Sequence, residues 1–324
     1  MNKKTLTLGK QRGLSQCATG GGFFNILALD HRQAVKKVFF NQRDPYFEAV
    51  AFKRDVVRSL SPMSTAILLD PSIGAGPCLS DYSLPGNCGL IVTVEASGYE
   101  GPSHARISRL PTDWNAGRIK RLGASAVKLL VYYHPRSETA PAMRDLVHQV
   151  SEECKRLDVA LFLEVLTYSP DPGGGKLSSE KLTEAVIQSA AELTPIGGDV
   201  YKAEFPMDVN QWPDPIDWVD ACRSLSEAST IPWVLLSAGV DYNVYAQQAE
   251  IACKAGASGI LAGRAIWKEA LESPISERQG FLATIGCERM SRMRFICETY
   301  GRSFRDFYAT NTLTEDWYGS YTDL

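Results

Sequence analysis

Short apolar runs alternate along the chain with longer segments in which apolar residues recur at helical spacing. The runs are rich in β-branched residues and end in polar residues or glycine, which is typical of buried parallel strands followed by helices. Strands are predicted at 24–30, 65–70, 90–95, 126–133, 160–166, 199–205, 233–239 and 258–264. The clearest helices are predicted at 142–157, 178–193 and 243–256, the last two with Ser178 or Ser179 and Asp241 or Asn243 as N-caps.

Eight strand–helix units favour an α/β fold of the closed (β/α)8 type, the TIM barrel. An open, doubly wound sheet is the alternative. It is disfavoured because no GxGxxG follows the first strand; the three glycines at 20–22 precede it. We expect residues 1–324 to form a single barrel domain, with 273–324 as a C-terminal helical extension and tail.

The composition limits the classes of partner that the protein is expected to bind. A formal charge of -3 over 324 residues argues against binding to nucleic acid or to an anionic membrane surface. The N-terminus lacks the apolar segment of a signal peptide, and no run approaches the length of a membrane span. The eight cysteines form no CxxC pair and are interpreted as reduced thiols. We therefore expect a cytoplasmic protein that acts on a small molecule, either as a monomer or as a homo-oligomer.

Two connecting segments are long enough to suggest a function. Residues 72–87 follow the second strand and residues 168–176 follow the fifth, so both are expected at the C-terminal face of the barrel, where active sites are built. Their glycines and prolines suit a lid or a tight cradle, and ordinary surface loops are the alternative.

Charged residues interrupt the apolar strands near their ends, where burial is costly unless the charge is paired or used. Lys128, Glu164 and Lys202 lie in three consecutive strands, so they can project into one pocket, and Asp30 closes the first strand. A lysine near other cations and an apolar wall can supply the neutral amine that Schiff-base formation needs. The alternative is a buried ion pair that only fixes the geometry of the barrel.

Glycines and an arginine follow the last two strands. Ser237 and Gly239 come after the seventh, and Gly263 and Arg264 after the eighth. In TIM barrels these loops often bind phosphate through backbone N–H groups, and an arginine adds matching donors. The pattern predicts a cradle for a phosphorylated substrate, although the glycines could simply permit tight turns.

Several segments in one order resemble the tagatose 1,6-bisphosphate aldolase family of class I aldolases, which also holds sulfofructose-phosphate aldolases. They are LALDHRQAVKKVF, AILLDPSIGAG, VKLLVYY, LEVLTY, DVYKAEFP, SAGVD and GRAIW, between about residues 20 and 272. The resemblance implies that Lys202 forms the Schiff base and Glu164 acts as acid and base, with Asp30 and Lys128 as further polar active-site residues. It also implies that Ser237, Gly239, Gly263 and Arg264 hold the phosphate of the dihydroxyacetone-phosphate half. No cofactor or metal is implied.

The first strand departs from the family pattern. It reads LALDHR where LALDQR is expected, so His31 replaces an amide. The resemblance places His31 near the distal end of the substrate, which puts the identity of the aldehyde half in doubt. Arg32 could hold a second phosphate or a sulfonate, or form an ordinary surface salt bridge. The expected substrate is a ketose 1-phosphate with an anionic C6 group, such as tagatose 1,6-bisphosphate or sulfofructose 1-phosphate.

Three other functions compete with this hypothesis. A metal-dependent aldolase needs clustered histidine ligands, and the sequence holds only His31, His104, His134 and His148, without a ligand pair. A barrel that binds a sugar phosphate could instead be a non-catalytic regulator. A phosphosugar isomerase or synthase would place paired carboxylates where Lys128 and Lys202 stand.

Overall fold

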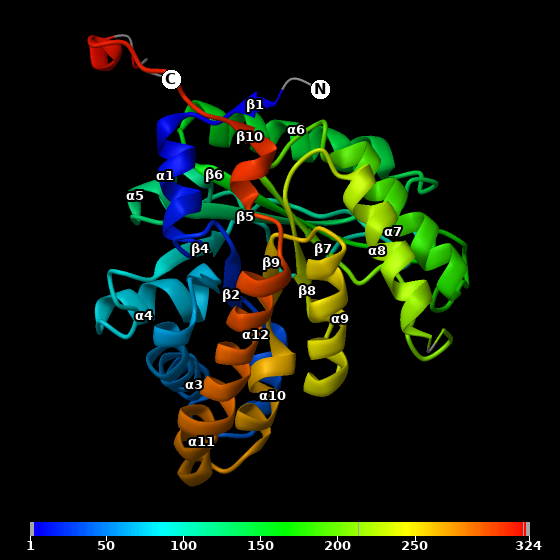
Figure 1. The fold of residues 1–324 in the computed structure, drawn as a ribbon. Helices are drawn as coiled ribbons and strands as arrows, with labels where there is room; N and C mark the ends of the chain where they lie inside the picture. Colours follow the sequence, from blue (N-terminus) through cyan, green and yellow to red (C-terminus); the bar gives the residue numbers. More distant parts are fainter. Residues whose placement is uncertain (1–2, 213, 320, 322–324) are drawn as a thin grey trace.

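A computed structural model describes residues 3–212, 214–319 and 321, and its centre is a closed barrel of eight parallel strands (Figure 1). The strands follow one another in chain order from β2 to β9, and pairing of β2 with β9 closes the ring. Their bounds are β2 Phe24–Leu29, β3 Ala66–Leu69, β4 Gly89–Thr93, β5 Ala126–Tyr132, β6 Ala160–Leu166, β7 Val200–Ala203, β8 Trp233–Leu236 and β9 Gly259–Ala262. The ends of the predicted domain, 1–2 and 322–324, lie outside the described residues.

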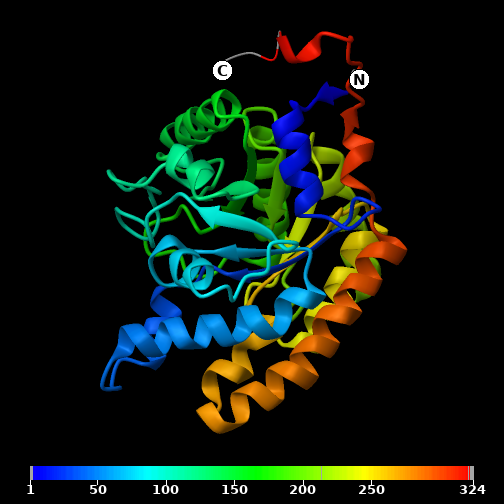
Figure 2. The same cartoon turned by 90° about the vertical axis from the view of Figure 1, so that its left-hand side faces the viewer.

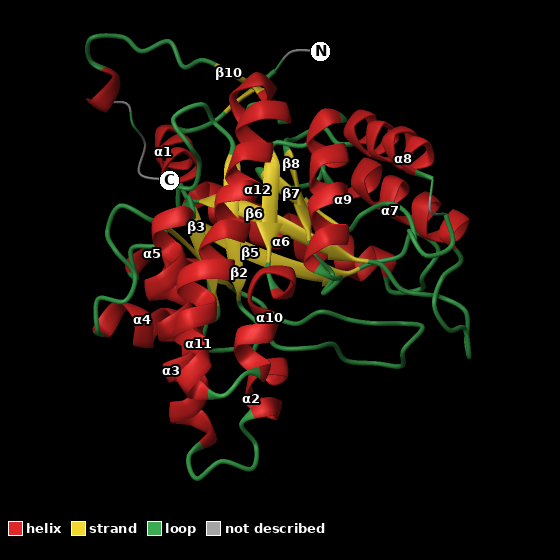
Figure 3. Ribbon diagram, turned by 60° about the horizontal axis from the view of Figure 1, so that its bottom comes forward, coloured by secondary structure: helices red, strands yellow, loops and turns green. Residues whose placement is uncertain are grey.

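Helices surround the barrel (Figure 3), and the predicted (β/α)8 fold is confirmed. Their bounds are α1 Leu8–Gln16, α2 Gln33–Val38, α3 Pro45–Leu60, α4 Gly76–Ser80, α5 Ala116–Arg121, α6 Ala140–Arg156, α7 Ser179–Leu193, α8 Pro215–Ala228, α9 Tyr242–Lys254, α10 Arg264–Glu272, α11 Ile275–Phe281 and α12 Cys287–Tyr300. Shorter turns are η1 Ser61–Met63, η2 Pro71–Ala75, η3 Leu282–Gly286, η4 Phe304–Phe307 and η5 Trp317–Gly319. Figure 2 shows α3 in blue beside the orange helices α11 and α12.

The eight predicted strands and the three named helices are found close to their predicted bounds. Several strands end earlier than predicted, because the polar residues that close the apolar runs, such as Asp30 and Asp70, already lie in the following turns. Ser178 is the N-cap of α7 and accepts a hydrogen bond from the Lys181 N–H, whereas Asp241 caps α9 without a side-chain hydrogen bond.

Side chains of each strand point alternately outward and inward, and this produces two apolar cores. One core lies between the strands and the helices, and the other lies inside the barrel. The inner core includes Phe24, Ala126, Phe162, Val200 and Val234, all in the N-terminal halves of their strands. Polar side chains are therefore left to fill the other end of the barrel interior, at the C-terminal ends of the strands, which we call the mouth.

The N-terminal end of the barrel is closed by both ends of the chain. The short strands β1 Lys4–Thr5 and β10 Tyr308–Ala309 pair in parallel, and Leu14 of α1 belongs to the inner core. Phe304 stacks on Phe24 with a ring separation of 5.2 Å, and the Tyr308 hydroxyl donates to the carbonyl of Asp199 at 2.5 Å. The tail thus covers one barrel end, and the open mouth lies at the other.

The two long connecting segments lie in different parts of the structure. Residues 72–87 are not a lid at the mouth, because they begin in η2 and α4 and then return the chain to the start of β4. Residues 84–90 line a cavity at the N-terminal end with Arg12 and Ser125. Residues 168–176, in contrast, form an irregular loop after β6 at the mouth, as predicted.

Two further expectations concern chemistry and location. All eight cysteines are free thiols, and six of them are buried. Within the described residues, no helix is both long and apolar enough to cross a membrane.

Candidate active site

Inward-facing side chains become polar at the mouth. The apolar residues Ala126 of β5 and Val200 of β7 face the inner core, and two residues further along the same face are Lys128 and Lys202. Glu164 of β6 pairs in register with Lys202. The three side chains are almost completely buried and line a cavity of about 260 Å³, as the strand pattern predicts.

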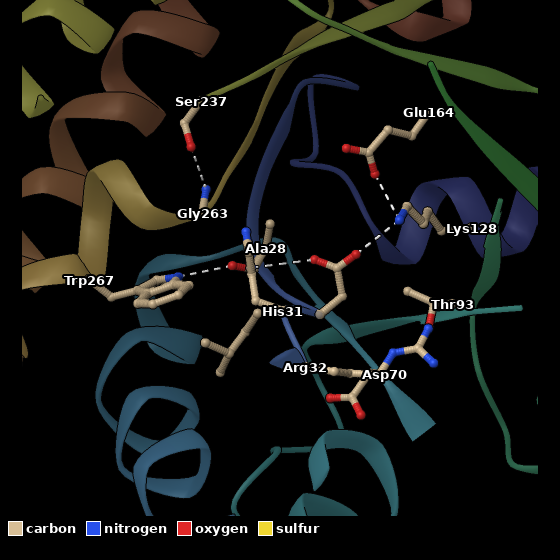
Figure 4. A network of polar contacts seen from close by, with 12 residues as sticks. Ala28, His31, Arg32, Asp70, Thr93, Lys128, Glu164, Ser237, Gly263 and Trp267 are labelled. Carbon is tan, nitrogen blue, oxygen red and sulfur yellow. Dashed lines mark hydrogen bonds and ion pairs between the residues drawn. The ribbon is translucent and has the colours of Figure 1, made fainter. Parts of the chain in front are cut away.

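Lys128 is surrounded by carboxylates from three other strands or their ends. Figure 4 shows one of them, Glu164, beside the Lys128 amine. Its Nζ lies 3.0 Å from Asp30 Oδ2, 2.7 Å from Glu95 Oε1 and 2.8 Å from Glu164 Oε2. Burial alone would lower the pKa of Lys128, but the three carboxylates outweigh it and raise the pKa well above its usual value. Lys128 is therefore a fixed positive charge.

Lys202 has a different setting, because in the described part of the chain its Nζ contacts one carboxylate, that of Glu164, at 2.8 Å. That carboxylate bridges the two lysines. Burial would raise the pKa of Glu164, but Lys128 and Lys202 together hold it below its usual value. Asp30 behaves in the same way: burial opposes ionisation, and the same two lysines keep its pKa well below the usual range. An amine beside an ionised carboxylate can pass a proton to it, which is the first requirement of a nucleophilic lysine.

The four residues selected as a phosphate cradle lie together after β8 and β9. Ser237 Oγ accepts a hydrogen bond from the Gly263 N–H at 3.1 Å. Gly239 has a φ of 79° and lies under the guanidinium of Arg264, where a Cβ would approach Arg264 Cζ to 2.9 Å. Glycine is needed for both reasons. Arg264 Nε is buried and has no hydrogen-bond partner among the described residues, so this donor remains available to an anion.

His31 lies beside these residues, whereas the resemblance in sequence placed it near the distal end of the substrate. A Cβ on Gly263 would lie 3.0 Å from His31 Cε1, and the imidazole packs edge-on against Trp267 at 5.3 Å. The reason is the closure of the barrel, because pairing of β2 with β9 brings the turns that follow them together. Burial, opposed by Asp30 and reinforced by Arg264, lowers the pKa of His31 to about 4, so the ring is neutral at pH 7.

Arg32 forms no salt bridge with any residue that the structure describes. Its Nη2 donates to the carbonyl of Glu95 at 2.7 Å and to Thr93 Oγ1 at 3.3 Å, and the side chain lines the catalytic cavity. All ten residues selected from the sequence thus lie at the mouth, nine of them lining the catalytic cavity; Gly239 contacts it through Arg264.

Two carboxylates at the mouth were not selected from the sequence. Glu95 holds Lys128 and accepts a hydrogen bond from the Leu130 N–H at 3.1 Å. Glu204 accepts from the backbone N–H and the hydroxyl of Thr167, yet burial, the dominant effect, raises its pKa to about 7. The same alternation that places Lys128 and Lys202 inward could have identified both. Among the described residues, no group of three His, Cys, Asp or Glu side chains could hold a metal ion.

Comparison with known proteins identifies the family of this chain. Residues 24–269 match the DeoC/LacD family aldolase. The chain is similar to the tagatose 1,6-diphosphate aldolase of Streptococcus agalactiae serotype V, with 30% identity over 93% of this chain and 99% of the relative. It is also similar to the tagatose 1,6-diphosphate aldolase of Lactococcus lactis subsp. lactis, with 29% identity over 90% and 96%.

Solved structures of low identity share the fold. An archaeal fructose 1,6-bisphosphate aldolase superposes with a TM-score of 0.59 at 18% identity, covering 88% of this chain and 97% of that one. The fructose-bisphosphate aldolase of Plasmodium falciparum superposes with a TM-score of 0.71 at 12% identity, covering 93% and 99%. Because the family match spans most of the chain and includes every candidate site residue, this protein belongs to the DeoC/LacD family of aldolases.

Proposed function

We propose that this aldolase cleaves a ketose 1-phosphate with an anionic group at C6, such as tagatose 1,6-bisphosphate. The products are dihydroxyacetone phosphate and a three-carbon aldehyde such as glyceraldehyde 3-phosphate, and Lys202 forms the Schiff base. The observation that carries the proposal is the unequal setting of the two buried lysines. Lys128 contacts three carboxylates, whereas Lys202 contacts one that it shares.

The unequal setting assigns different roles to the two amines. Removing the proton from Lys128 would leave three buried carboxylates without their counter-charge, which is strongly unfavourable. Removing the proton from Lys202 costs less, because Glu164 accepts it and Lys128 still balances the remaining carboxylates. Lys202 is therefore the nucleophile and Lys128 the fixed charge that orients Glu164.

In the first half of the reaction Lys202 passes a proton to Glu164, and the neutral amine attacks the C2 carbonyl of the substrate. The new C–N bond gives a carbinolamine. Glu164 returns the proton to the carbinolamine hydroxyl, which leaves as water, and a positively charged iminium remains on Lys202.

In the second half Glu164, ionised again, takes the proton of the C4 hydroxyl. The bond between C3 and C4 breaks, its electrons flow into the iminium, and the aldehyde leaves. The resulting enamine is protonated at C3, which restores the iminium, and water hydrolyses it to dihydroxyacetone phosphate and the free amine of Lys202. Ser237, Gly263 and Arg264 hold the C1 phosphate during both halves.

Borohydride trapping tests this proposal. The protein is treated with sodium borohydride and dihydroxyacetone phosphate, and the adduct is located by peptide mass spectrometry. We expect one adduct, on Lys202, which is absent in K202M. An adduct on Lys128 would overturn the assignment of the two lysines. No adduct from a folded protein that still binds the ligand would overturn the Schiff-base mechanism.

The same preparation tests the substrate class. Ketose 1-phosphates that carry a phosphate, a sulfonate or a hydroxyl at C6 are compared for release of the aldehyde. Cleavage of the hydroxyl compound alone would refute the requirement for an anionic C6 group, and the other two compounds distinguish a bisphosphate from a sulfofructose substrate.

A further inference from the structure

A second cavity, of about 530 Å³, adjoins the catalytic cavity at the mouth. Leu236 and Ala238 line both cavities. The second cavity is also lined by the loop after β6, including Tyr168, by Glu204 after β7 and by Arg106 from the connection between β4 and α5. No step of the reaction described so far uses it.

Arg106 occupies an unusual position in this cavity. Its guanidinium lies on the rings of Tyr99, Tyr132 and Tyr168, at 4.6, 5.4 and 4.9 Å from their centres. Its Nε donates to the carbonyl of Ser103 at 3.0 Å. Within the described residues, neither of its terminal nitrogens has a hydrogen bond, and no carboxylate forms an ion pair with it. A positive charge is thus held in place by tyrosines while most of its donors stay available.

One tyrosine connects this charge to the catalytic lysine. Tyr132, the last residue of β5, lines the catalytic cavity together with Glu164 and Lys202. The Arg106 guanidinium lies 5.4 Å from the centre of the Tyr132 ring and lines the neighbouring cavity. Burial raises the pKa of Tyr132, and Arg106 opposes this effect more than any other group. The guanidinium is therefore one aromatic ring away from the site of bond cleavage.

The order of the strands sets the direction of the substrate. The phosphate cradle follows β8 and β9, whereas Arg106 packs on residues of β5 and of the loop after β6. In a ring of eight strands, β9 and β5 are four strands apart and lie on opposite sides. An open-chain ketose with its C1 phosphate at Arg264 and its carbonyl at Lys202 extends toward Arg106.

We propose that this second cavity receives the aldehyde half of the substrate and that Arg106 binds its anionic C6 group, a phosphate or a sulfonate. Arg106 would then determine specificity for charged over uncharged aldehydes. This inference rests on the proposed function and deepens it. Arg32, which the sequence suggested for this role, uses its Nη2 in hydrogen bonds to residues of β4 and the turn after it.

Glu204 lines the same cavity and would repel an anion when ionised. Its pKa, raised to about 7 mainly by burial, leaves much of it neutral at pH 7. Lys176 also faces the cavity, but its amine is paired with Asp208 at 2.6 Å. Arg106 is therefore the donor best suited to the C6 group.

The test compares R106M and R106K with R109M. Arg109 is a matched control because it is an exposed arginine of the same connection, paired with Glu100 at 2.8 Å. For R106M we expect kcat/KM to fall about 10- to 100-fold with a C6 phosphate or sulfonate, the loss of a charge-assisted hydrogen bond. Activity with a C6 hydroxyl should stay within about 2-fold of wild type, and R106K should recover part of the loss, since it retains the charge.

Separate readouts keep the two proposals apart. Borohydride trapping of dihydroxyacetone phosphate on Lys202 should be unchanged in R106M. Equal losses with charged and uncharged substrates would show that Arg106 only stabilises the fold, and no loss with either would show that it does not meet the substrate; both overturn the inference. If trapping fails in the wild type, the proposed function fails. Calorimetry of the bisphosphate then tests whether Arg106 binds the C6 group. Weaker binding to R106M but not to R109M supports that role, and equal binding to both variants overturns it.

Discussion

Replacing Lys128 with methionine should destabilise the protein in a way that depends on pH. The substitution keeps most of the side-chain volume but leaves Asp30, Glu95 and Glu164 buried without the amine that contacts all three. Breaking a buried ion pair by removing one partner costs about 3 to 5 kcal/mol, and a centre with three partners should lie at the upper end of that range.

The direction of the pH effect follows from the pKa shifts. In the wild type, Lys128 and Lys202 hold the pKa values of Asp30 and Glu164 below their usual values, so the stabilisation they give persists above about pH 4 and is lost at lower pH. In K128M burial dominates and the pKa values of these carboxyls rise above those of the unfolded chain. Their contribution is then present at low pH and is lost as pH rises.

The free energy of unfolding of K128M should therefore fall further below the wild type at pH 8 than at pH 5. Urea denaturation followed by tryptophan fluorescence measures both. K155M, at an exposed lysine that pairs with Glu152, serves as the control and should change the free energy of unfolding by less than about 0.5 kcal/mol. A loss in K128M that is the same at pH 5 and pH 8 would refute the idea that this lysine sets the ionisation of the carboxylates.

Two further predictions concern the phosphate cradle. In G239A the new Cβ would strain a backbone with φ of 79° and displace the Arg264 guanidinium, so KM for the ketose phosphate should rise about 10-fold. The control G123A, at a glycine with φ of 85° and open space around it, should leave KM unchanged. Similar KM values for the two variants would contradict the role of the contact between Gly239 and Arg264. The second prediction concerns the Kd of H31Q for dihydroxyacetone phosphate, divided by the Kd of the wild type. Because burial lowers the pKa of His31 to about 4, this ratio should be constant from pH 6 to 8 and should increase below about pH 5, where His31 gains a positive charge beside the phosphate. A change in the ratio near pH 6.5 would show that His31 titrates normally.

The barrel could be predicted because its strands are buried on both sides and form continuous apolar runs. Strand bounds were less certain, since residues such as Asp30 and Asp70 end the apolar run but already belong to the turns. Segment 72–87 was misplaced because glycine and proline, which usually indicate loops, here occur in η2 and α4. Local sequence does not show that these residues are helical.

The site was predictable where alternation along single strands decides it. Lys128, Glu164 and Lys202 follow inward apolar residues at a spacing of two, and the same rule applied to Ile91 and Thr93 would have selected Glu95. The neighbourhood of His31 required the closure of the ring between β2 and β9, which joins residues more than 200 positions apart. No pattern in the sequence pointed to Arg106, because this residue lies in an irregular connection whose path depends on the tyrosines around it.

The pairing of β1 with β10 has a practical consequence. Both strands lie at the N-terminal end of the barrel, away from the mouth, at the top of the view in Figure 1. Affinity tags, fused partner domains or attachment to a solid support can therefore be introduced at either terminus without obstructing the entry of sugar phosphates. A C-terminal truncation that removes Phe304 would have a different effect. It would remove the ring that stacks on Phe24 and expose the inner core to water at this end of the barrel.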